Sequence, residues 1–377
     1  MIIDATIAAT RKIPLINGLR GIAILGVVLH HLYGEVIVQG DAIYWLGPIP
    51  VSPLTLITNS YQGVALFFML SGFVLTLPYI QQRRTMLGAA DIFTFFRRRA
   101  LRLFPLYIVA LIIGLTLIAP PANFSDLATQ VPLYITGIFT FTERHFFPDA
   151  NFVLWSLGLE LLFSLLFPFI LICMQKFGVW KMITGLCIVA LIARIFGVFM
   201  IQEVGAAELF PGTTTPAFNH IFCRIDDFVL GMGLAVLYVR QPQLRALWFY
   251  ILGFLSLLVG CTLRDLSVGV LPLAVQPFSN TFVNLGMFAL ITTMLLQPKR
   301  IWTLLLENRP LQLIGLMCYS IFVWHGVLIF PLQASTDLLH LALYTVVVCV
   351  VSFLSYRYIE FFSIAPLRNI LPRRLLP

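Results

Sequence analysis

The sequence predicts an all-α fold, a polytopic membrane helical bundle of about ten transmembrane helices with both termini in the cytoplasm. Composition is the first reason, because 60% of the 377 residues are hydrophobic and only 11% are charged. A soluble domain carries roughly a quarter charged residues. The second reason is that the hydrophobic residues form long runs, near the ~20-residue length that a spanning helix needs. The third reason is the distribution of Lys and Arg between these runs.

The runs follow one another with connections that carry no soluble appendage or internal repeat. We therefore expect residues 1–377 to form a single integral membrane domain. Residues 1–10 lack the features of a cleavable secretory signal, so the first span itself is expected to target the chain to the membrane. The segment VPLYITGIFTF at 131–141 is too short to cross a bilayer, which indicates a re-entrant or interfacial piece. The expected spans are 15–34, 62–80, 103–119, 152–174, 179–201, 217–238, 246–263, 281–297, 311–332 and 340–358.

The basic residues predict the orientation, because cytoplasmic connections of membrane proteins are rich in Lys and Arg. One set of alternate connections holds eighteen of the 24 Lys and Arg residues, whereas the opposite set holds only Arg144 and Arg264. The net charge of +8 is thus expected to anchor the protein beside anionic lipid, and no nucleic-acid partner is predicted. The eighteen are Arg11, Lys12, Arg83, Arg84, Arg97, Arg98, Arg99, Arg102, Lys176, Lys181, Arg240, Arg245, Lys299, Arg300, Arg309, Arg368, Arg373 and Arg374.

The six cysteines all lie in apolar segments and show no metal-type spacing. They are interpreted as small buried hydrophobic residues rather than as disulfides or ligands, and no metal cofactor is predicted.

The first span carries Arg20 and His31, although ionisable groups inside a membrane are costly and by default indicate function. Eleven residues at about 100° each bring the two side chains to within about 20° on one helix face, about 16 Å apart along the axis. Arg20 is expected near the cytoplasmic mouth and His31 in the outer half. His30 points about 100° away and is expected to pack or to make a structural hydrogen bond.

The next two spans add a glycine and a basic cluster. Gly72 permits close approach of another helix or of a ligand, and Ser71 can hydrogen-bond across helices. Arg98 and Arg102 are one helical turn apart and are suited to bind phosphate groups, although anchoring to anionic lipid explains the same cluster.

Later spans place further polar residues at the depth expected for His31. The chain direction puts Glu160 about 12 Å below the outer end of its span, with Arg224 and Asp226 at similar depth. The ninth span brings Tyr319 and His325 to the same zone. A carboxylate beside an imidazole suits general-base removal of a proton from a hydroxyl.

Cationic groups at the inner rim and acid–base groups in the outer half fit an acyl-CoA donor. Its nucleotide phosphates would lie in the cytoplasm and its thioester deep in the membrane. The channel of about 16 Å predicted along one helix face is comparable in reach to a phosphopantetheine arm.

These residues resemble the motifs of the acyltransferase-3 family of integral membrane acyltransferases, in its stand-alone form. Six motifs occur in the family's order over nearly the whole chain. Departures from the family pattern are Ser164 in place of a Tyr, Gly158 in place of a Ser, and His30 in place of an aromatic or aliphatic residue. A further departure is Glu360, which FFSIAP follows where the family has a nearby Pro. The six motifs are Arg20 with His31 in INGLRGIAILGVVLHH, GVALFFMLSGFVL at 63–75, Arg98, Arg99, Arg102 and Pro105, WSLGLELLF at 155–163, Arg224 with Asp226, and YSIFVWH at 319–325.

The resemblance implies an enzyme that transfers an acyl group, most often acetyl from acetyl-CoA, to a hydroxyl of a cell-surface, secreted or lipid-linked carbohydrate. Succinyl and longer acyl donors fit the residues too. Direct transfer and an acyl-enzyme intermediate are both compatible with them, and direct transfer is preferred because it needs fewer groups. The chain is expected in the bacterial inner (plasma) membrane, and no signal of oligomeric state is present. The implied roles are His31 as catalytic base, Glu160 in support of catalysis, Arg20, Arg98, Arg99 and Arg102 in donor binding, and Ser71, Trp155, Arg224, Asp226, Tyr319 and His325 at the substrate or in support.

Two other function classes fit part of the pattern. A proton-coupled transporter of a small solute would use His31, Glu160 and Asp226 as a relay, but the two matching halves typical of transporters are absent. A membrane scaffold or sensor with structural buried ions would leave the Arg20–His31 face and the basic cluster at 97–102 without a common cause.

Overall fold

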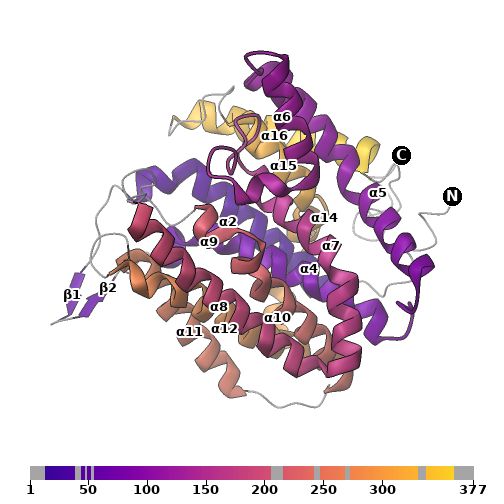
Figure 1. Ribbon diagram of the computed structural model, residues 1–377. Coiled ribbons are helices and arrows are strands. Elements are labelled where there is room, and N and C mark those ends of the chain that lie inside the picture. Colours follow the sequence, from indigo (N-terminus) through magenta and orange to yellow (C-terminus); the bar gives the residue numbers. More distant parts are fainter. Residues whose placement is uncertain are drawn as a thin grey trace.

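The computed structural model describes residues 13–38, 44–46, 49–51, 55–204, 215–241, 247–267, 272–329 and 337–360. Residues 1–10, expected to carry no cleavable signal, lie outside this part, as do the basic residues Arg11, Lys12, Arg245 and those of the tail. Figure 1 shows a bundle of helices in which α2 and α4 run between α8, α10, α11 and α12 on one side and α5, α6, α15 and α16 on the other.

The long helices confirm the predicted polytopic helical bundle. Eight helical segments of the described residues are long and apolar enough to cross a membrane, and a ninth candidate is the helix pair α14–α15, bent by 70°. The main helices are α2 (Pro14–Val38), α4 (Gly63–Ile80), α5 (Ala89–Ile113), α7 (Leu154–Phe177), α8 (Val179–Val204), α10 (Ile221–Arg240), α11 (Leu247–Leu266), α12 (Gln276–Leu296), α14 (Arg309–Leu316), α15 (Cys318–Leu328) and α16 (Leu338–Ser355).

Short elements connect or extend the long helices. The expected non-spanning piece at 131–141 forms the end of α6 and the turn η3, and neither is among the candidate spans. A small antiparallel ribbon pairs β1 with β2. The short elements are β1 (Tyr44–Leu46), β2 (Ile49–Val51), α3 (Thr55–Thr58), η1 (Ser60–Gln62), η2 (Gly114–Ile118), α6 (Phe124–Thr136), η3 (Ile138–Phe141), α9 (Pro216–Asn219), η4 (Leu273–Val275), α13 (Arg300–Leu306) and η5 (Tyr356–Glu360).

Helix α5 begins earlier than the sequence indicated. The span was expected at 103–119, but the helix starts at Ala89 and continues through the basic cluster and past Pro105. Asp91 in its first turn accepts hydrogen bonds from the Leu87 amide and the Thr85 hydroxyl, which stabilises this early start. The basic side chains at 97–102 therefore project from a continuous helix, at helical spacing.

Helix α10 lies at the centre of the bundle and packs closely on α4. A Cβ atom on Gly72 of α4 would collide with the Phe228 carbonyl oxygen, and one on Gly231 of α10 with the Met69 carbonyl oxygen. The close helix contact expected at Gly72 is thus confirmed, since only glycine at both positions lets the backbones approach so far. This contact fixes the height of Ser71, the neighbour of Gly72, against the rest of the bundle.

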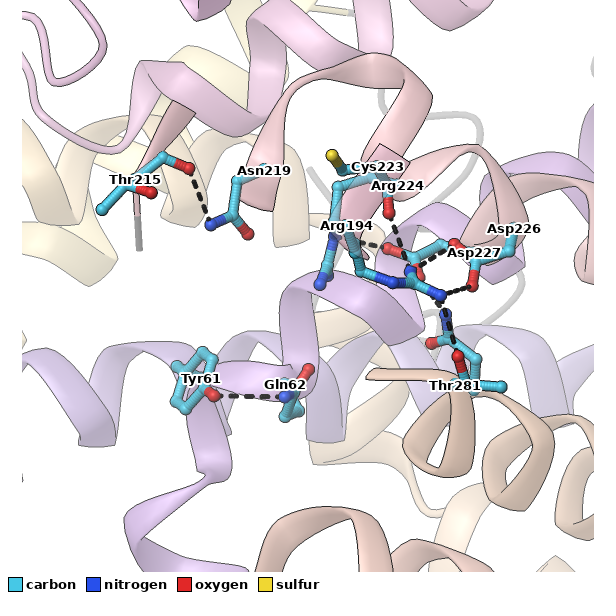
Figure 2. A network of polar contacts seen from close by, with 11 residues as sticks. Tyr61, Gln62, Arg194, Thr215, Asn219, Cys223, Arg224, Asp226, Asp227 and Thr281 are labelled. Carbon is cyan, nitrogen blue, oxygen red and sulfur yellow. Dashed lines mark hydrogen bonds and ion pairs between the residues drawn. The ribbon is translucent and has the colours of Figure 1, made fainter. Parts of the chain in front are cut away.

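Helix α10 is not among the apolar candidates for membrane spans, because three charged residues lie near its start. These residues, Arg224, Asp226 and Asp227, are nevertheless buried. Their charges are paired inside the protein, as Figure 2 shows. Arg194 of α8 contacts both carboxylate oxygens of Asp226, at 2.9 and 3.1 Å, and also donates to the Thr281 hydroxyl of α12. These ion pairs let a charged helix occupy the middle of an apolar bundle.

The pairing separates Arg224 from Asp226, the two residues of one sequence motif. Arg224 binds Asp227 at 2.8 Å, and Asn284 of α12 donates to the other oxygen of Asp227. The reason is helical geometry, because residues two apart point to opposite sides of a helix whereas residues three apart share a side. Asp226 therefore faces α8, and Arg224 remains on the side of Asp227.

We predict that Arg194→Met destabilises the protein by about 3–5 kcal/mol, because the Asp226 carboxylate then stays buried without its cation. Thermal unfolding of the purified protein in detergent measures the effect. The exposed Arg97→Met serves as the matched control and should leave the unfolding temperature nearly unchanged.

The double variant Arg194→Met with Asp226→Leu should regain much of the lost stability, since neither charge is then left alone. A double variant that unfolds at a lower temperature than Arg194→Met would contradict the pairing.

Candidate active site

A cavity of about 110 Å³ lies where α2, α4, α5, α7 and α15 meet. Its wall contains six of the residues that the sequence analysis assigned to the site, from five helices. The apolar part of the wall includes Phe67, Phe68 and Phe322. The six assigned residues are Arg20, Ser71, Arg99, Arg102, Glu160 and Tyr319.

Glu160 of α7 is held by α4 and α5. Its carboxylate forms an ion pair with Arg99 and accepts a hydrogen bond of 2.5 Å from the Ser71 hydroxyl. Ser164, one turn further along α7, accepts from Arg99 Nε at 3.0 Å. Ser164, which stands where the family pattern has a Tyr, thus gives Arg99 a second hydrogen-bond acceptor beside Glu160. Glu160 was expected beside His31, but its contacts place it with the arginines of the cavity.

Arg102 is neutralised by a residue that the sequence analysis did not assign to the site. Glu360 of η5 forms an ion pair with Arg102, and its other oxygen accepts from the Ser320 hydroxyl at 2.7 Å. The Arg102 guanidinium also lies 5.3 Å from the ring centre of Tyr319, whose hydroxyl donates to the Leu103 carbonyl. The only sequence feature that could have assigned Glu360 to the site is its position as a single carboxylate after the last apolar run.

Arg20 is the cavity cation for which no hydrogen bond or ion pair to another described residue is present. Glu360 is nevertheless close enough to interact with it electrostatically. Across the cavity wall, the charges of Arg99 and Arg102 are each matched by a carboxylate. The charge of Arg20 is therefore the one left to attract an anion.

Arg98 lies outside the cavity and is exposed. The directions of Arg99 and Arg102 differ by about 60° around α5, and the cavity occupies the sector between them. Arg98 points about 70° away from the middle of that sector. The pair that faces the cavity is therefore Arg99 with Arg102, and Arg98, expected with Arg102 at the donor phosphates, lies outside it.

His31 of α2 pairs with His325 of α15. His31 Nδ1 lies 3.0 Å from His325 Nε2, and the two rings stack with their centres 5.2 Å apart. The ring of Phe152 packs edge-on against His31 at 5.0 Å. The expected meeting of these two histidines is thus present, and within the described residues the hydrogen-bond partner of His31 is an imidazole rather than a carboxylate.

The cavity wall does not include His31. Phe322 contacts both parts of the site, because it lines the cavity and its ring centre lies 5.4 Å from that of His325. Arg20 and His31 share a continuous helix, as predicted. The cavity that Arg20 lines does not extend to His31, so Phe322 and His325 are the residues that connect the two parts of the site.

Three other assigned residues, Trp155, Arg224 and Asp226, do not line the cavity. Trp155 packs on Phe146 with ring centres 5.5 Å apart. Arg224 stands behind the wall, with its guanidinium 6.0 Å from the ring centre of the lining residue Phe68. The His30 ring packs against Tyr61 and edge-on against His31, with ring centres 5.0 and 5.5 Å apart.

Known proteins similar in sequence to this chain are acyltransferases. The sequence profile of the acyltransferase-3 family, described as an acyltransferase domain, matches residues 13–357. The chain is 23% identical over 371 residues to the O-acetyltransferase OatA of Staphylococcus aureus (strain NCTC 8325 / PS 47), covering 93% of this chain and 57% of that protein. It is 24% identical over 346 residues to the putative O-acetyltransferase SACOL0978 of Staphylococcus aureus (strain COL), covering 85% and 51%.

The chain thus spans little more than half the length of these curated relatives. No solved structure matches it significantly. The family profile covers nearly all of the described helices and every residue of the cavity wall. The chain belongs to the acyltransferase-3 family.

Proposed function

We propose that this protein is a membrane O-acetyltransferase that moves an acyl group from cytoplasmic acyl-CoA to a hydroxyl of a cell-surface, secreted or lipid-linked carbohydrate. The family and the names of the relatives support O-acetyl transfer. The observation that carries the proposal is the cavity with Arg20, Arg99 and Arg102 in its wall, next to the His31–His325 pair. Cations suit an anionic donor, and an imidazole suits proton removal from a hydroxyl.

The donor is proposed to lie along α5 and enter the cavity with its thioester end. The cavity, of about 110 Å³, would take the short acyl thioester. The nucleotide phosphates would stay outside it, where the exposed Arg98 projects from the same helix. Arg20 inside the cavity would interact with the polar arm, and Arg99 and Arg102 are already oriented by their carboxylate partners.

In the proposed reaction, the acceptor oxygen attacks the thioester carbonyl while His31 takes the hydroxyl proton. The C–O bond forms, the C–S bond breaks, and the thiolate of CoA leaves and regains a proton from His31. The guanidinium groups of the cavity favour the negative charge that develops on the carbonyl oxygen. Glu160 supports this step by holding Arg99 in place.

We predict that His31→Ala lowers acyl transfer by about 10²–10⁴-fold, because the general base is lost. The measurement is incorporation of a labelled acetyl group from acetyl-CoA into envelope glycan, in membranes with equal amounts of the protein.

The control is the adjacent His30→Ala, which should cost much less because His325 hydrogen-bonds His31, whereas the His30 ring packs on Tyr61. Full transfer by His31→Ala, or equal losses in the two variants, would contradict the base assignment.

We also predict that Arg20→Gln raises the KM for acetyl-CoA by about 10-fold or more, since it removes the cavity cation that has no carboxylate partner of its own. Arg98→Gln should raise the KM less, and its effect should disappear at high salt because an exposed charge is screened. The exposed Arg97→Gln is the matched control. An unchanged KM in Arg20→Gln would remove Arg20 from donor binding.

A further inference from the structure

The hydrogen bond between His31 and His325 determines which nitrogen of each ring carries a proton. His325 belongs to α15 and is fully buried. Its Nδ1 lies 3.2 Å from the Ile321 carbonyl oxygen of the preceding turn, and its Nε2 lies 3.0 Å from His31 Nδ1. Both ring nitrogens of His325 therefore have a partner, and one of these partners is known to be an acceptor.

A carbonyl oxygen only accepts, so His325 Nδ1 must carry a proton. A neutral imidazole has one N–H group, which leaves a lone pair on His325 Nε2. The hydrogen bond between the two rings then needs a proton on His31 Nδ1. It follows that His31 Nε2 is left with a free lone pair, the state in which it can accept a proton from a hydroxyl.

A charged His325 would reverse these roles, but its surroundings oppose a cation. The groups around the pair are the aromatic rings of Phe152 and Phe322 and the imidazole of His30. No carboxylate of the described residues is hydrogen-bonded to either His31 or His325. Burying a charge without a counter-ion is costly, which favours the neutral pair.

We propose that His325 is a positioning residue for acyl transfer, which accepts the Nδ1 proton of His31 and thereby keeps His31 Nε2 unprotonated and directed at the acceptor hydroxyl. This inference rests on the proposed function, in which His31 is the base. The role corresponds to that of the carboxylate in a Ser–His–Asp triad, which fixes the tautomer of its histidine. Here a neutral imidazole, itself fixed by a backbone carbonyl, takes that place.

The proton path follows from this arrangement. When the acceptor oxygen bonds to the acyl carbon, its proton moves to His31 Nε2. The Nδ1 proton of His31 stays in its hydrogen bond to His325 Nε2, so the imidazolium is stabilised without a second proton transfer. The Nε2 proton then passes to the thiolate that leaves when the C–S bond breaks, and His31 returns to its starting tautomer.

Two substitutions of His325 separate the hydrogen bond from the volume of the ring. His325→Gln places an amide oxygen where Nε2 accepts and an amide N–H able to bond the Ile321 carbonyl, so we expect kcat within about 10-fold of wild type. His325→Phe keeps the ring but removes the acceptor, so kcat should fall about 100-fold or more.

The KM for acetyl-CoA should stay unchanged in both variants, because the cavity arginines are untouched. Equal kcat values for the Gln and Phe variants, with equal amounts of folded protein, would overturn the proposal.

A spectroscopic measurement tests the tautomer without relying on activity. Solid-state NMR of protein with ¹⁵N-labelled histidine in bilayers distinguishes protonated from unprotonated ring nitrogens, and subtraction of the His31→Gln spectrum assigns the signals. We expect His31 to carry its proton on Nδ1 in the wild type and in His325→Gln, and on Nε2 in His325→Phe.

An Nε2-protonated His31 in the wild type would overturn the inference even if the enzyme is active. If the wild type transfers no acyl group to any glycan, the proposed function fails, while the NMR result still decides how the two histidines are paired.

Discussion

The structure depends on one constraint: a charge that is fully buried in the apolar bundle needs a partner, because hydrocarbon offers no water to replace it. Helix α10 shows this most clearly. It crosses the centre of the protein with Arg224, Asp226 and Asp227 near its start, and the pairs with Arg194 and within the helix itself satisfy all three. These ion pairs tie α8 and α12 to α10, on whose other side α4 packs through glycines. The part of the cavity wall that α4 contributes is thereby supported by α10 and its ion pairs.

The same constraint divides the cations of the cavity into two kinds. Arg99 and Arg102 have carboxylate partners, so their guanidinium groups are held in place before any ligand arrives. Such preorganised charge costs little to use when negative charge develops nearby. Arg20 has no hydrogen-bonding partner among the described residues and remains available to an anion. The cavity thus combines two oriented cations with one that a ligand can engage.

No counter-ion among the described residues is hydrogen-bonded to the histidine pair. His31 and His325 satisfy each other, and the carbonyl of Ile321 satisfies the second nitrogen of His325. Phe322 belongs to both parts of the site, because it lines the charged cavity and packs against His325. The proposed transfer needs the neutral pair and the cavity arginines to act together in one low-dielectric space.

The sequence by itself determined the helical bundle, the helix shared by Arg20 and His31, and the family. These features follow from local patterns, namely apolar runs of spanning length, the 100° step of a helix, and motifs of fixed spacing. Only the tertiary structure determined which polar side chains bond to one another. Glu160 bonds Arg99 rather than an imidazole, Asp226 bonds Arg194 rather than Arg224, and His31 bonds His325. A partner depends on which helices touch and how far each is shifted along its axis, and the close contacts between distant segments set both. Hydrophobic periodicity does not depend on how far one helix is shifted along its axis against its neighbours. The sequence could therefore predict which polar residues lie at equal depth, but not which of them pair.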